Sequence, residues 1–283
     1  MTRLPDIRVP AKQVGHRGRL ELRFERRRGR TVVAHAYAEP PLRIGASFEV
    51  DGAAYLILVC SGPGIFAGDA LRQSIHVAHG ARVVLTTQSA LQVHPSPAAA
   101  AARIDHEYCV DDDGELCCHW DPVIPFAGAR LAQHYDIRIA GGARLYWSDA
   151  LMSGRVSRGE SWQFRDLANE LRLRVNDRLV YLERYRIGAE PDRMRRRWTS
   201  GGIDYLATAL VWHGKASREA ADRLQQAMGA CDQVRAGIDL VEDRLIVARL
   251  AASSGVAFSA ARCLVRTLAV TEMFGRQPTL DRK

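Results

Sequence analysis

Apolar and polar residues alternate along most of the first three quarters of the chain, which is the pattern of β-strands with one buried face. Residues 20–24 read Leu-Glu-Leu-Arg-Phe, and residues 31–37 form a second run rich in β-branched and aromatic side chains. Residues 55–60 are apolar throughout, as in a strand that is covered on both faces. The pattern predicts a mainly β fold over about residues 19–212.

Four segments share one form, in which an alternating run leads through a tight turn into a second run. They span residues 75–85, 108–116, 137–147 and 171–181, and their turns contain Gly, Asp or Asn, which tolerate positive φ. Each is interpreted as a β-hairpin. Because the turns recur roughly every 30 residues, they predict an elongated scaffold of stacked strands, either a β-solenoid or sandwich-like. One large antiparallel sandwich is the alternative.

Helical spacing is confined to a small C-terminal portion, about residues 215–275. Ser217 is the predicted N-cap of one helix. Residues 244–250 are strand-like. Ser254, or the serine before it, begins a second helix that is expected to end before Gly275.

The composition is that of an ordinary globular chain, with 47% hydrophobic and 25% charged residues. No linker separates the helices from the β region, so we expect one domain over residues 1–283. Residues 1–30 lack the apolar stretch of a secretory signal, and no apolar run approaches the roughly 20 residues that span a membrane. The six cysteines show no Cys-x-x-Cys spacing. We therefore expect a cytoplasmic protein with reduced thiols and no membrane association.

The glycine-rich loop at residues 60–69 follows a buried strand and invites comparison with nucleotide-binding loops. Its third glycine comes one residue late for a dinucleotide fingerprint, and residues 71–77 alternate like a strand where a helix is needed. No Gly-Lys-Ser/Thr phosphate loop and no Gly-x-Ser-x-Gly elbow occur in the sequence. We expect no catalytic residues and no enzymatic activity. A metal- or nucleotide-dependent enzyme is the competing interpretation.

Histidine and cysteine spacing does not favour a closed metal centre. His76 and His79 are three residues apart, which places them on opposite faces of a strand. Of the consecutive residues Cys117, Cys118 and His119, at most the first and third share a face. A four-ligand zinc site is therefore not expected.

The net charge of +8 comes almost entirely from arginine, because the chain has only three lysines. Basic runs lie at residues 26–28 and 193–197. No recognition helix, zinc finger or RNA-binding motif accompanies them. Contacts with acidic protein partners are favoured over nucleic-acid binding, since arginine is common in protein interfaces.

Four segments together are similar to the UreD family of urease accessory proteins, also called UreH. They are Ser-Gly-Pro-Gly-Ile-Phe-Ala-Gly-Asp at residues 61–69, Gly-Ala-Arg-Val-Val-Leu-Thr-Thr-Gln at 80–88, Asp-Pro-Val-Ile-Pro-Phe-Ala-Gly-Ala-Arg at 121–130 and Gly-Arg-Val-Ser-Arg-Gly-Glu-Ser-Trp-Gln-Phe at 154–164. They occur in the order and at the spacing of the family, and Leu-Glu-Arg follows at 182–184. Where many members read Gly-Gly-Asp at the end of the first segment, this chain has Ala-Gly-Asp.

The resemblance implies an elongated, mostly β protein that acts in urease maturation. Members of the family bind UreF and, through it, the GTPase UreG, and they dock onto apo-urease. An internal water-filled passage is thought to carry Ni²⁺ to the urease active site. The resemblance therefore implies transient Ni²⁺ and no tightly bound cofactor. We expect the C-terminal helices to form the UreF interface.

Two acidic residues, Asp69 and Glu160, lie in the glycine-bearing segments that carry the resemblance. Because buried carboxylates are rare unless paired or functional, both are predicted to face an interior passage and to bind Ni²⁺ transiently. The alternative is that each caps a turn or is paired with an arginine such as Arg155. Replacing Glu160 with alanine should then reduce urease activation without loss of folding or UreF binding. An unrelated β-rich binding scaffold is the second competing interpretation.

Overall fold

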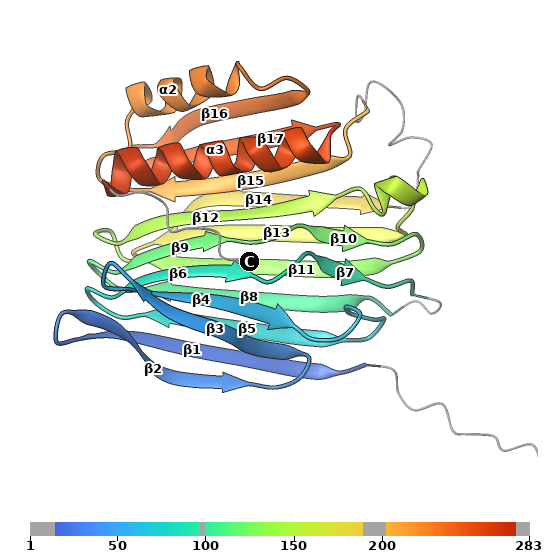
Figure 1. Cartoon of the computed structure of the whole chain (residues 1–283), viewed down its shortest axis with the longest axis horizontal. Coiled ribbons are helices and arrows are strands. Elements are labelled where there is room, and N and C mark those ends of the chain that lie inside the picture. Colours follow the sequence, from blue (N-terminus) through green and yellow to red (C-terminus); the bar gives the residue numbers. More distant parts are fainter. Residues whose placement is uncertain (1–14, 97–99, 189–201, 276–283) are drawn as a thin grey trace, which may run out of the picture.

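The computed structural model describes residues 15–96, 100–188 and 202–275, and its strands lie side by side in two facing sheets (Figure 1). Residues 1–14 and the basic run 193–197 lie outside the described residues. Sheet A contains β1 (Arg17–Arg27), β2 (Arg30–Ala38), β5 (Ala70–Val77), β8 (Ala102–Val110), β11 (Arg130–Ile139), β13 (Asp166–Val175) and β14 (Arg178–Gly188).

Sheet B contains the remaining strands, and helices cover its outer face at one end (Figure 1). Its strands are β3 (Leu42–Val50), β4 (Ala53–Cys60), β6 (Arg82–Thr87), β7 (Leu91–Val93), β9 (Glu115–His119), β10 (Val123–Pro125), β12 (Arg144–Met152), β15 (Tyr205–Trp212), β16 (Val234–Glu242) and β17 (Leu245–Ala252). The helices are the 3₁₀ turn η1 (Val156–Arg158), α2 (Arg218–Met228) and α3 (Gly255–Phe274).

The middle of both sheets is parallel, because the chain passes alternately from one sheet to the other. In sheet A, β1, β5, β8, β11 and β13 pair in parallel, and in sheet B the parallel strands are β4, β6, β9 and β12. Antiparallel strands close both ends. The result is a β-solenoid of about four turns, so the predicted mainly β, stacked-strand scaffold with a small helical C-terminal portion is confirmed.

Three of the four predicted hairpins are wrong, because their two strands belong to different sheets. The segments at residues 75–85, 108–116 and 137–147 are arches that lead from sheet A to sheet B. Only the segment at 171–181 is a hairpin, formed by β13 and β14. A strand facing a core alternates in the same way whether the next strand pairs beside it or crosses to the opposite sheet. The roughly 30-residue recurrence is therefore the solenoid period.

The arches explain why the sequence Gly-Ala-Arg recurs. Arg82, Glu115 and Arg144 follow successive turns and are register partners in β6, β9 and β12. Glu115 is buried between the two arginines, with Oε1 3.7 Å from Arg82 Nε and Oε2 3.2 Å from Arg144 Nε. A buried carboxylate needs such partners. The alternating charges therefore tie three solenoid turns together at this edge.

The predicted helix boundaries are confirmed by their caps. Ser217 precedes α2 and its hydroxyl accepts the Ala220 N–H at 3.2 Å, while Ser254 caps α3 through the Ala257 N–H at 3.4 Å. Gly275 ends α3 in the left-handed conformation, with φ of 67°. The strand predicted at 244–250 is β17, and the pattern did not indicate β16. Within the described residues, no helix combines the length and apolar character needed to cross a membrane.

Three apolar clusters stabilise this arrangement, two of them between the sheets. The larger contains Phe24, Leu85 and Trp147, and the smaller contains Ile65 and Phe164. The third lies between sheet B and the helices. Adjacent Cys117 and Cys118 belong to the third and the first cluster, so they do face opposite sides of β9.

Candidate functional site: the motif loops and the polar interior

The family-like segments meet at one edge of the solenoid through a stack of side chains. The Phe66 ring lies parallel to the His94 imidazole with centroids 4.4 Å apart, and His94 meets the Phe126 ring edge-on at 4.9 Å. The Arg155 guanidinium carbon lies 4.0 Å from the centre of the Phe126 ring. Stacking and cation–π contacts thus join loops from successive turns. We call the segments 61–69, 121–130 and 154–164 the motif loops.

The remaining family-like segment, residues 80–88, joins the same assembly through Thr87. Its hydroxyl donates to Asp121 Oδ2 at 3.0 Å and accepts the Asp121 N–H at 2.9 Å. The four segments are thus linked into one assembly, directly or through His94, which their order in the sequence does not reveal.

Asp69 is buried, with 2% of its surface exposed, and its carboxylate accepts two backbone hydrogen bonds. Oδ1 accepts the His16 N–H at 2.7 Å, and Oδ2 accepts the Phe66 N–H at 2.8 Å. The second bond caps the turn that begins at Phe66, and the first fixes the segment that enters β1. These contacts are those of a turn cap.

Glu160 is held by an arginine. Arg155 Nε donates to Glu160 Oε2 at 2.7 Å, its second nitrogen donates to Oε1, and the Ala127 N–H donates to Oε2 at 3.3 Å. The hydrogen bond from Arg155 lowers the pKa of Glu160. The contacts of Asp69 and Glu160 are thus those of the alternative interpretation, and their predicted part in binding Ni²⁺ stays a prediction.

A row of polar side chains crosses the interior of sheet A and lies among otherwise apolar residues. Gln73 is the register partner of His106, which is in turn the partner of Tyr135. On the next strands Asn169 is the partner of both Gln133 and Tyr185. The Gln133 amide donates to the Tyr135 hydroxyl, which connects the first set of three register partners with the second. This interior polar row consists of Gln73, His106, Tyr135, Gln133, Asn169 and Tyr185.

His106 carries the most unusual chemistry of the row. Its imidazole stacks on the Tyr135 ring at 4.4 Å, and burial lowers the pKa of His106 to about 3, so that it is neutral at physiological pH. Neither ring nitrogen has a hydrogen-bond partner among the described residues, and the same holds for Gln73 Nε2. Buried polar atoms normally bind protein groups or internal water. This part of the row is therefore suited to holding water or a small polar guest.

Two cavities lie at opposite ends of the interior polar row. The first has a volume of about 120 Å³ and is lined by Gln73, His106 and Thr87 among apolar residues. The second has a volume of about 550 Å³ and is lined by Tyr185 and Asp149, among others. Both exceed the roughly 30 Å³ that one water molecule occupies in the liquid.

Two carboxylates, Asp149 and Glu183, line the second cavity from opposite sheets. Thr208 lies between them, donating its hydroxyl to Glu183 Oε1 at 3.2 Å and its N–H to Asp149 Oδ1 at 3.4 Å. Arg249 lies 2.8 Å from Glu183 Oε2. Burial, and then the negative charge of Glu183, raise the pKa of Asp149 to about 7. Asp149 is therefore a carboxyl group that can gain or lose a proton near neutral pH.

The sequence analysis missed this pair, although a signal was present. Asp149 shares a strand face with Leu145, Trp147 and Leu151, which all belong to the cores between the sheets. An acidic residue on an apolar face at period two marks a buried carboxylate. Glu183 lies in the Leu-Glu-Arg segment, flanked on its own strand face by Tyr181 and Tyr185.

Comparison with known proteins identifies the family. The model of the UreD urease accessory protein family matches residues 16–283. A urease accessory protein UreD from Deinococcus radiodurans is 30% identical over 270 residues, covering 94% of both chains. UreD proteins from Anaeromyxobacter sp. (29% identical, 97% of this chain and 94% of the relative) and Sorangium cellulosum (38% identical, 76% and 67%) are also similar.

The chain belongs to the UreD family. Its role is therefore in urease maturation, and, like other UreD-family accessory proteins, it is not an enzyme. Within this UreD chain, the motif loops form one edge of the solenoid, and the interior polar row with its two cavities runs between the sheets.

Proposed function

We propose that this chain passes Ni²⁺ to apo-urease through its interior, along the interior polar row and the Asp149–Glu183 pair. The observation that carries the proposal is the placement of this row. It has a cavity at each end and separates the two apolar clusters between the sheets, so it offers polar contacts among apolar residues. Burying polar side chains in an apolar core costs free energy. The presence of such a row therefore points to a function.

The chemistry of the row suits a cation that must be accepted and released. Ni²⁺ binds imidazole and carboxylate groups, and the neutral imidazole of His106 keeps the lone pair of one ring nitrogen free for a metal ion. Amide and hydroxyl oxygens such as those of Asn169 and Thr208 bind it more weakly. Separate weak ligands along a path permit transfer, whereas a closed cage of strong ligands would trap the ion.

The proposal includes the partners implied by the family, namely UreF, the GTPase UreG through UreF, and apo-urease. Val241 of β16 and Val256 of α3 support a partner surface on the C-terminal portion, because they are 49% and 83% exposed. We assign the UreF contact to this portion and place the complex in the cytoplasm.

The test is the double variant Asp149→Asn with Glu183→Gln, co-expressed with the urease subunits and the other accessory proteins. Removing both charges from the second cavity should lower urease activation at least about tenfold, because the amides bind Ni²⁺ far more weakly than carboxylates. Urease activity and the nickel content of purified urease give the readout, and co-purification with UreF reports on the complex.

Glu170→Gln is the matched control. Glu170 lies on the outer face of sheet A and is paired with Arg172 and Arg184. The substitution therefore removes a carboxylate without changing the interior. Activation should remain at the parent level in this variant. The passage is refuted if the double variant, still bound to UreF, loads urease with nickel as well as the parent does.

The predicted role of Asp69 and Glu160 has its own test. Because Glu160 holds Arg155 and the Ala127 N–H, Glu160→Ala should cost about 1–2 kcal/mol of stability. If Glu160 also lies on the nickel route, Glu160→Gln, which keeps an acceptor for both donors, should still reduce activation. Thermal unfolding and urease activation are measured together. Unchanged activation with Glu160→Gln would assign Glu160 to the loop structure alone.

A further inference from the structure

Three side chains of different chemistry meet on the outer face of sheet A. His76 of β5 and Cys109 of β8 are register partners on neighbouring parallel strands, and Asp111 follows β8 in the arch. His76 Nε2 lies 3.1 Å and 3.0 Å from the two carboxylate oxygens of Asp111. One imidazole nitrogen, the thiol sulfur and one carboxylate oxygen all lie within 4.8 Å of one another.

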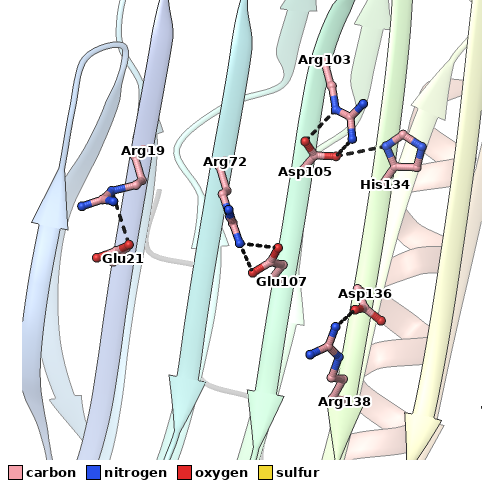
Figure 2. Close-up of polar contacts among 9 residues, drawn as sticks. All are labelled: Arg19, Glu21, Arg72, Arg103, Asp105, Glu107, His134, Asp136 and Arg138. Carbon is pink, nitrogen blue, oxygen red and sulfur yellow. Dashed lines mark hydrogen bonds and ion pairs between the residues drawn. The ribbon is translucent and has the colours of Figure 1, made fainter. Parts of the chain in front are cut away.

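The surroundings of this cluster make it unusual on this face. Figure 2 shows the neighbouring carboxylates, each bound by an arginine: Glu21 by Arg19, Glu107 by Arg72, Asp105 by Arg103 and Asp136 by Arg138. Among the described residues, Asp111 has no arginine within ion-pair distance, and its partner is His76. These four arginines are thus bound to other carboxylates. The imidazole nitrogen, the thiol sulfur and the carboxylate oxygen of the cluster therefore lie together with no arginine paired to Asp111 among the described residues.

We propose that His76, Cys109 and Asp111 form a surface site for one divalent transition-metal ion of the zinc, cobalt and nickel class. A thiolate and an imidazole favour these ions, whereas Mg²⁺ and Ca²⁺ take oxygen ligands. Bonds of about 2.0–2.3 Å place tetrahedral ligand atoms about 3.3–3.8 Å apart. Rotation of exposed side chains supplies the small approach that is needed, because Cys109 is exposed and the other two are partly exposed.

The proposed site is open to solvent and would bind its metal ion reversibly. It supplies three protein ligands and leaves the remaining position to water, unlike the closed four-ligand zinc centre that the sequence spacing argues against. The Cys109 thiol gives its proton to solvent as the metal–sulfur bond forms, so affinity should rise with pH. The site lies on the outer face of sheet A, away from the interior polar row, and its existence does not depend on the proposed nickel passage.

The experiment is a titration of the purified, reduced full chain with Co²⁺, whose bond to a thiolate gives a charge-transfer absorption. We expect one Co²⁺ per chain with this absorption, displaced by Zn²⁺ or Ni²⁺. Cys109→Ser should abolish the absorption. His76→Gln and Asp111→Asn should each raise the dissociation constant at least about tenfold, as loss of even an outer-shell partner of a metal does.

Two controls distinguish this site from others in the chain. His134 and Asp105 form an imidazole–carboxylate pair at 3.1 Å on the same face, without the thiol, so His134→Gln should leave the titration unchanged. Cys60→Ser removes a thiol that lines the first interior cavity and should also leave the absorption in place. A charge-transfer band that survives Cys109→Ser, or the absence of any band in the parent chain, would overturn the site.

Discussion

Replacing Gly154 with alanine is expected to prevent the chain from accumulating in folded form. Gly154 adopts φ of 144°, and a Cβ atom there would lie 1.9 Å from the Glu160 carbonyl oxygen and 3.3 Å from that of Pro125. Both obstacles are backbone atoms of the motif loops, which cannot yield without breaking the Arg155–Glu160 contact and the turn that contains it. Strain and clash together should cost about 4 kcal/mol or more.

The matched control is Gly159→Ala, five residues later in the same loop. Gly159 also has a positive φ, of 75°, but no atom lies within 4 Å of the Cβ that alanine would add. It should therefore cost only about 1 kcal/mol, the usual penalty for a left-handed alanine. Soluble yield and thermal unfolding of the two variants decide the matter. Equal unfolding temperatures would show that the loop can move to admit the methyl group.

The fold could be predicted in its class but not in its connections. Alternation located β1 and β5 to within a few residues, because a half-buried strand imposes period two whatever its partner is, and a continuous apolar run located β4. The turns at residues 78–81 and 140–143 each close with a hydrogen bond between residues three apart, 3.0 Å long in both cases, as a tight hairpin turn also would. Which strand lies beside which is decided by long-range packing, so arches were taken for hairpins.

The site was predictable only where its residues lie close together in the sequence. The motif loops are continuous segments, so Asp69, Glu160 and the nearby Arg155 were found, but one further donor to each carboxylate comes from far away in the chain, from His16 and Ala127. The interior polar row takes about one residue from each solenoid turn: Gln73, His106 and Tyr135 are separated by roughly 30 residues. A polar residue recurring on an apolar strand face at that period is the signal that would have located it.

The Asp149→Asn variant is expected to be more stable than the parent chain at pH 8 and no more stable at pH 4. The pKa of Asp149 rises from 3.8 in the unfolded chain to about 7 in the folded one. Below about pH 4 the group is protonated in both states and contributes nothing to the difference. Between pH 4 and pH 7 the folded state binds more protons than the unfolded state, so the stability of the parent falls as pH rises.

The size of this effect follows from the same shift. A rise from 3.8 to about 7 corresponds to about 4 kcal/mol when fully expressed, and solvent in the second cavity reduces the expected gain of Asp149→Asn to about 1–3 kcal/mol at pH 8. Urea unfolding at pH 4, 6 and 8 measures it, with Glu170→Gln as the control that should gain nothing. A destabilised Asp149→Asn at pH 8 would contradict the buried charge.

At pH 8, Ni²⁺ should make the parent chain more stable than Asp149→Asn, the reverse of their order without metal. A cation bound between Asp149 and Glu183 offsets the charge that the parent buries, and a ligand that binds only the folded state stabilises it. Added Ni²⁺ should therefore raise the stability of the parent at pH 8 by more than that of Asp149→Asn, which keeps only the surface site at His76, Cys109 and Asp111. The cost of an ionised Asp149 in the absence of metal and its proposed capacity to accept a metal ion then have one physical origin, a carboxylate that the fold buries beside a second negative charge.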